Sequence, residues 1–133
     1  MTRTNGRPVL RLLLLIVVTV ALTMQAACSS ADTKTFTLNV ISADGQTRTE
    51  TIKTEKTKLG DALVDEEIIP FSEDGFVTTV YGDDLSSLSN DKQMAYWAFY
   101  IGDNYAETGI FDTDITDGAE YTLKVDIYVY SES

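Results

Sequence analysis

The stretch that decides the fold is the apolar run Tyr96-Trp97-Ala98-Phe99-Tyr100-Ile101, which is followed by the turn residues Gly102-Asp103-Asn104. Alternate side chains of a strand point to opposite faces, so the run predicts a strand that is apolar on both faces. Tyr96, Ala98 and Tyr100 share one face, and Trp97, Phe99 and Ile101 share the other. Two roles stay open for these rings. Either they are core, packed under a helix or covered by residues 90–94 or Phe111, or some of them contact a ligand.

Strands are expected on both sides of this run. Phe36–Ile41 alternates, and the turn Asp44-Gly45 connects it to the Thr-rich stretch Thr47–Thr54, which predicts a hairpin whose second strand lies at a sheet edge. Phe76–Tyr81 predicts a further strand. Tyr121–Tyr130 alternates most clearly of all and predicts the last strand.

One stretch of the chain has helical spacing. Leu59, Ala62 and Leu63 stand at i, i+3 and i+4, with Thr57 as the expected N-cap, and Pro70 limits any extension. One short helix among several strands predicts an α+β fold, in which a mixed sheet is covered on one face by that helix.

The first 27 residues are expected to be an export signal. Three arginines and no acid precede the apolar run Leu12–Leu22, and small residues then lead to Cys28. Eleven helical residues reach only about 16 Å, roughly half of a bilayer core, so this run is too short for a transmembrane anchor.

Cys28 stands where a bacterial lipoprotein signal places its lipidated cysteine. Ala26 and Ala27 fit that pattern, whereas Gln25 stands where leucine is usual. We expect a lipoprotein signal peptide in residues 1–27, a lipidated Cys28 with a tether to residue 34, and one domain over residues 35–130, anchored outside the cytoplasm. The alternative is an ordinary signal cut near Ala27, which would leave a free thiol.

Composition narrows the function. The chain of 133 residues has no His, which excludes a Ser-His-Asp triad and Cys/His zinc sites. Removal of residues 1–27 leaves 7 Lys and Arg against 21 Asp and Glu, a net charge of −14, so nucleic acid is not an expected partner. Paired-carboxylate catalysis is the remaining enzyme class, but a domain this small has little room for a saccharide cleft. We therefore expect no enzymatic activity.

Several of these stretches together resemble the DUF4430 family, the transcobalamin-like C-terminal domain. They are Phe36–Val40, Leu59-Gly60-Asp61-Ala62-Leu63, the run Tyr96–Ile101 with its turn, Thr108-Gly109, and Asp117-Gly118-Ala119-Glu120-Tyr121. The resemblance covers roughly Thr35 to Tyr128. Two positions depart from the family pattern, the turn Gly102-Asp103-Asn104 and Ala119.

This resemblance implies a β-grasp-like module that binds a ligand without catalysis, and in the B12 carriers the domain lies against one face of the corrin. A corrin is a broad apolar plate edged with amides, so its site needs aromatic area and main-chain donors. The expected ligand is a corrinoid such as cobalamin, and no cofactor is required. The expected ligand-binding residues are Trp97, Phe99, Tyr100 and Tyr105.

The alternative is a cell-surface interaction or scaffold domain that presents its sheet edge or aromatic strand to an envelope protein. In this alternative calcium is a candidate stabiliser of the domain, because Phe111–Gly118 is rich in acids. The stretch fails the EF-hand spacing, since Thr116 stands at the fifth position and Gly118 at the seventh. No metal ligands are therefore assigned, and Asp117-Gly118 is expected to be a turn into the last strand.

Overall fold

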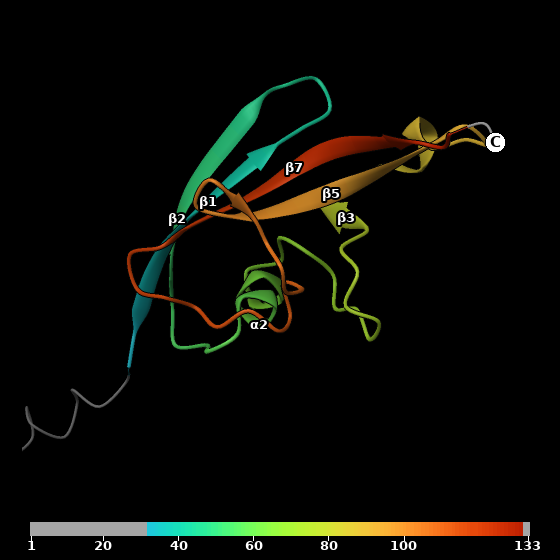
Figure 1. The fold of residues 1–133 in the computed structure, drawn as a ribbon. Helices are drawn as coiled ribbons and strands as arrows, with labels where there is room; N and C mark the ends of the chain where they lie inside the picture. Colours follow the sequence, from blue (N-terminus) through green and yellow to red (C-terminus); the bar gives the residue numbers. More distant parts are fainter. Residues whose placement is uncertain (1–31, 132–133) are drawn as a thin grey trace, which may run out of the picture. The chain divides into compact units, whose positions relative to one another are not determined.

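The computed structural model describes residues 32–131 (Figure 1). The predicted signal peptide, Cys28 and the tether up to residue 31 lie outside the described residues. No helix of the described part is long and apolar enough to cross a membrane. The elements in chain order are β1 Lys34–Ile41, β2 Thr47–Thr54, α2 Leu59–Asp65, β3 Thr79–Val80, β4 Asp83–Asp84, the 3-10 turn η1 Ser86–Leu88, β5 Gln93–Ile101, β6 Asn104–Tyr105 and β7 Glu120–Val129.

Five of these strands form one mixed sheet in the order β2-β1-β7-β5-β6. The central pair, β1 and β7, is parallel, and all other neighbours are antiparallel. The predicted α+β class is confirmed, and so is the hairpin of β1 with the edge strand β2. At the opposite edge, β6 pairs only with Tyr100 and Ile101 of β5.

The core lies between the sheet and α2, which covers one face of the sheet (Figure 1). Strand alternation turns Phe36 and Leu38 of β1 and Leu123 of β7 inward, and all three are buried. Leu59, Ala62 and Leu63 of α2 are fully buried, as their spacing predicts. Burial of this apolar face is what stabilises so short a helix.

The start of α2 differs from the expectation. The helix begins at Leu59, no side chain caps it, and the predicted cap Thr57 lies outside it. Its first two main-chain N–H groups instead donate to distant carbonyls: Leu59 N to Thr113 O at 2.9 Å and Gly60 N to Ile110 O at 3.0 Å. The loop before β7 therefore satisfies donors that a local side chain was expected to satisfy.

The strand predicted over Phe76–Tyr81 is mostly wrong, because only β3 forms there and pairs with β4. The Asp74 carboxylate accepts the Phe76 N–H at 3.1 Å, which makes an Asx turn at the start of the stretch. At its end, Tyr81 and Gly82 both have left-handed φ values, 50° and 77°, and close the hairpin early. Phe76 is left 71% exposed.

Candidate functional site

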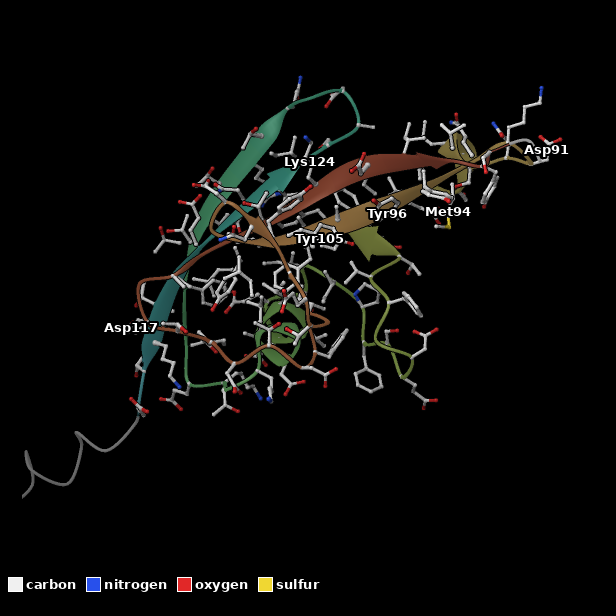
Figure 2. The ribbon with its side chains drawn as sticks, in the orientation of Figure 1. Asp91, Met94, Tyr96, Tyr105, Asp117 and Lys124 are labelled. Atoms are coloured by element: carbon white, nitrogen blue, oxygen red, sulfur yellow. The ribbon has the colours of Figure 1, made fainter. Side chains whose placement is uncertain are left out.

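The four predicted ligand residues divide between the two faces of the sheet. Trp97 is only 7% exposed and belongs to the core. Phe99 is half-buried and packs against this core. Tyr100 lies on the opposite face, where its ring meets Tyr105 edge-on at a centroid distance of 5.5 Å. Tyr105 is 60% exposed and lies beside β5 on the short strand β6 (Figure 2).

A pocket of about 740 Å³ brings three of the four together. Trp97, Phe99 and Tyr105 line it, whereas Tyr100 does not. Its other walls come from residues 75–78, 84–89 and 106–110, so three loops enclose one side of β5. The apolar part of this lining includes Phe76, Val77, Leu85, Ile110 and Leu123.

The open edge of β5 borders this pocket. Ala95 N–H donates to Ser89 Oγ at 3.0 Å, and Phe99 C=O accepts from Ala106 N–H at 2.9 Å, so these residues direct their main-chain groups away from β7. By the alternation of an antiparallel strand, the N–H and C=O of Trp97 point the same way. Within residues 32–131, neither group has a hydrogen-bond partner on that side.

The Trp97 side chain adds an unused donor. Its Nε1 is buried and has no hydrogen-bond partner among the described residues. A buried indole N–H normally finds an acceptor, and leaving one unpaired costs about 1–3 kcal/mol. Trp97 therefore offers a main-chain donor and a main-chain acceptor at the open edge of β5, and its side chain carries a further unpaired donor.

The pocket is electrostatically negative. Asp84 and Glu107 are among its lining residues, which include no Lys or Arg. The main-chain N–H of Ser86 donates to the Asp84 carboxylate at 2.6 Å, and this bond lowers the pKa of Asp84. Asp84 is therefore ionised at neutral pH, and the site disfavours anionic ligands.

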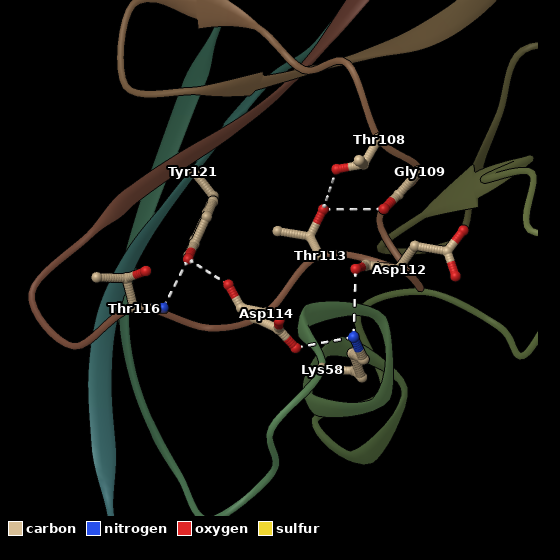
Figure 3. Close-up of polar contacts among 8 residues, drawn as sticks. All are labelled: Lys58, Thr108, Gly109, Asp112, Thr113, Asp114, Thr116 and Tyr121. Carbon is tan, nitrogen blue, oxygen red and sulfur yellow. Dashed lines mark hydrogen bonds and ion pairs between the residues drawn. The ribbon is translucent and has the colours of Figure 1, made fainter.

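The acidic loop considered for calcium already holds a cation of the protein's own. Lys58 Nζ lies 2.8 Å from Asp114 Oδ1 and donates to the Asp112 carbonyl at 3.3 Å (Figure 3). Beside them, the Tyr121 hydroxyl accepts the Thr116 N–H at 3.0 Å. The described residues contain no group of three or more Asp, Glu, Cys or His placed to hold a metal ion.

The loop walls of the pocket are the part that sequence reasoning missed. Residues 84–89 are mostly polar in sequence, yet Leu85 among them is 5% exposed and lines the pocket. Asp74 and Asp84 each accept the N–H two residues later, and such Asx turns are a local signal of a bent chain. They predict where the chain turns but not which cavity it encloses.

No family model matches the sequence, so membership of the DUF4430 family stays a prediction. No curated protein matches it either. Solved structures do share the fold. A candidate metal-binding protein from Ruminococcus gnavus ATCC 29149 is 24% identical, with a TM-score of 0.61 over 70% of this chain and 96% of that chain.

Haptocorrin in complex with Cbi is a second structural match. It is 14% identical, with a TM-score of 0.53 over 74% of this chain and 26% of that chain. This chain therefore spans a minor part of haptocorrin. At these identities both likenesses show a shared fold.

Proposed function

We propose that this chain is a lipid-anchored, extracytoplasmic binding module whose pocket beside β5 takes a corrinoid such as cobalamin. One observation carries the proposal: a pocket of about 740 Å³ in which aromatic rings adjoin the unpaired main chain of Trp97. Phe99 and Tyr105 supply apolar area, and Trp97 supplies hydrogen-bonding groups.

The chemistry of a corrinoid suits this lining. Its broad apolar plate packs against aromatic and aliphatic side chains, and its peripheral amides both donate and accept hydrogen bonds. An amide beside Trp97 can accept from the main-chain N–H and donate to the C=O, as a neighbouring strand would. The two carboxylates of the lining, Asp84 and Glu107, favour such neutral groups over anions.

The shared fold with haptocorrin supports the proposal of a corrinoid ligand. Haptocorrin is a transcobalamin-like protein, and its structure holds Cbi, a cobalamin analogue. The sequence resemblance to the DUF4430 family and its β-grasp-like domain agrees with this match. We propose that the module contacts one face of the corrin and leaves the other face for a partner in the envelope.

We propose that binding occurs without catalysis. The chain lacks His, and the pocket lining contains no Cys or Lys. These are the side chains that most often act as bases or nucleophiles at neutral pH.

The test is a titration of the purified protein with cobalamin and cobinamide, followed by heat and by the fluorescence of Trp97, the chain's single tryptophan. Both signals should saturate together, after correction for corrinoid absorption. Tyr105→Ala should weaken binding about tenfold, the effect of about 1.4 kcal/mol of lost apolar contact. Tyr128→Ala is the matched control, because Tyr128 is also exposed (56%) but does not line the pocket. Absence of binding at millimolar ligand, or equal effects of the two variants, would refute the proposal.

The anchor is tested separately. Cys28→Ala should release the protein from the membrane fraction, since acyl chains contribute about 0.8 kcal/mol per buried CH₂. Retention of the variant in that fraction would show that lipidation of Cys28 does not anchor the chain.

A second candidate function, docking of an envelope protein, is favoured by the far end of the β5–β7 pair. Both faces expose apolar side chains there: Met94 is 43%, Ile127 46% and Val129 64% exposed. Exposed apolar groups that cluster in this way are typical of interaction surfaces. Ile127→Glu should abolish cross-linking to an envelope partner, whereas Phe71→Ser, at a 69% exposed position away from the pair, should not.

A further inference from the structure

A second, smaller cavity of about 250 Å³ lies between the turn end of the β1–β2 hairpin and the β3–β4 hairpin. Its walls combine apolar and polar side chains: Val40, Ser42, Gln46, Thr47, Arg48, Val80, Tyr81, Asp83 and Trp97. Trp97 also lines the larger pocket, so its side chain borders both cavities. None of the residues predicted from sequence, apart from Trp97, belongs to this second site.

Two residues that line this cavity carry buried side-chain donors without a partner. Among the described residues, the buried side-chain nitrogen and oxygen atoms without a hydrogen-bond partner are Tyr81 Oη and Trp97 Nε1. Both belong to residues that line the cavity. Buried polar groups in native proteins are nearly always paired, so two orphans on one cavity point to an absent acceptor.

Tyr81 is held in a strained and fixed position. It has a left-handed φ of 50°, which is unfavourable for a residue with a bulky side chain, and its N–H donates to Ile68 O at 2.8 Å. The Arg48 guanidinium lies over its ring, with Cζ 3.7 Å from the centroid. Backbone strain of this kind persists where the surroundings enforce it, and it concentrates at ligand sites.

The charges around the cavity favour a neutral ligand. Arg48 is already paired with Glu50 at 2.5 Å, and Asp83 adds a further carboxylate to the lining. Burial raises the pKa of the Tyr81 hydroxyl, and the nearby Glu50 carboxylate raises it further, so Tyr81 stays protonated. The Glu50 carboxylate lies close to this hydroxyl, although no hydrogen bond of normal geometry joins them.

We propose that this cavity binds a small neutral amide, whose carbonyl oxygen accepts hydrogen bonds from Trp97 Nε1 and Tyr81 Oη. The amide nitrogen then donates to Asp83 or to the polar side chains of the β1–β2 turn. The amide belongs either to a free small molecule or to the side chain of a peptide. This second site shares Trp97 with the larger pocket, but it uses the Trp97 side chain and Tyr81, whereas the corrinoid proposal uses the Trp97 main chain and Tyr105.

The indole N–H of Trp97 reports directly on this site, since it gives a single side-chain signal in a ¹H–¹⁵N spectrum of the purified protein. Isobutyramide should move this signal downfield in a saturable way. Isobutyrate has nearly the same shape but carries a negative charge, and should bind at least tenfold more weakly. A blocked glutamine tripeptide is the second arm. Tighter binding than isobutyramide identifies a peptide side chain as the source of the amide, and weaker binding identifies a free small amide.

Two variants show which of the two cavities binds isobutyramide. Tyr81→Phe keeps the ring under Arg48 but removes one donor, and should weaken isobutyramide about tenfold. Tyr105→Ala changes only the larger pocket and should leave isobutyramide binding unchanged. An indole signal that does not move, or equal affinity for isobutyrate, overturns the proposal. The proposal is also overturned if Tyr105→Ala loses isobutyramide binding while Tyr81→Phe keeps it, because the amide would then lie in the larger pocket.

Discussion

Substitution of Gly60 by alanine tests the contact that joins α2 to the loop before β7. A Cβ atom on Gly60 would lie 2.6 Å from Cγ and 2.9 Å from Cα of Phe111. Both distances are shorter than non-bonded carbon atoms tolerate, and one of them involves the backbone, so rotation of the ring alone cannot relieve the clash. The loop itself would have to move.

The expected cost follows from three contributions. Overpacking of a core costs about 1–3 kcal/mol. Movement of the loop also weakens the hydrogen bond from Gly60 N–H to Ile110 O, worth about 1 kcal/mol. Alanine in a helix returns about 1 kcal/mol relative to glycine. The net loss is therefore about 1–3 kcal/mol, and the midpoint of thermal unfolding should fall by about 5–20 °C.

Urea and thermal unfolding followed by circular dichroism measure this loss. Gly109→Ala is the matched control in the same loop, because its Cβ would meet only Asp112 Oδ2 at 3.8 Å, an ordinary contact. This control should change stability by less than about 0.5 kcal/mol. If Gly60→Ala is as stable as Gly109→Ala, or more stable than the natural chain, the contact with Phe111 does not constrain the loop and the reasoning fails.

Three further substitutions test other contacts. Tyr121→Phe should cost about 1–2 kcal/mol and speed hydrogen exchange at Thr116, whose N–H loses its acceptor. Lys58 lowers the pKa of Asp114 below its usual range, so their pairing stabilises the fold near neutral pH and is lost as the pH falls through the lowered pKa. The melting temperature of Asp114→Asn should therefore differ from that of the natural chain more at about pH 7 than at about pH 2. Trp97→Ala should destabilise by about 3–5 kcal/mol in urea unfolding, because Trp97 is core, and no loss would contradict its burial.

The sequence predicts those parts of the fold that depend on local periodicity. Alternation along Phe36–Ile41 and Tyr121–Tyr130 identifies β1 and β7 and the faces that they bury, because a strand in an antiparallel or mixed sheet with one solvent face must alternate. The spacing of Leu59, Ala62 and Leu63 likewise identifies α2. In each case the pattern that predicts the element lies entirely within that element's own residues.

Contacts between distant segments carry no such signal. The N–H groups of α2 bond carbonyls some fifty positions later in the chain, and Thr57 was a reasonable local substitute for them. Phe76–Tyr81 alternates like a strand, but the left-handed Tyr81 ends the pairing after two residues. The aromatic run predicts the rings Trp97, Phe99 and Tyr105 as ligand contacts, whereas the pocket that they line depends on three loops that periodicity does not describe.

The pocket exists because the β5–β6 hairpin stops early. Tyr100 pairs with Tyr105, so continuation of the same register would place Thr108 opposite Trp97 and occupy the open edge of β5. Instead the chain leaves the sheet after Ala106, and the Thr108 hydroxyl lies 3.2 Å from that of Thr113. The carbonyls of Ile110 and Thr113 then receive the first N–H groups of α2.

The same hydrogen bonds thus satisfy the start of the helix and hold the chain away from Trp97. A loop that moves, as in Gly60→Ala, should therefore change ligand affinity in the larger pocket together with stability. Gly109→Ala should leave stability unchanged, and it serves as a control for stability alone because Gly109 itself lines the pocket. Separation of the two effects, with stability lost and affinity kept, would show that the pocket does not depend on the contact between α2 and its capping loop.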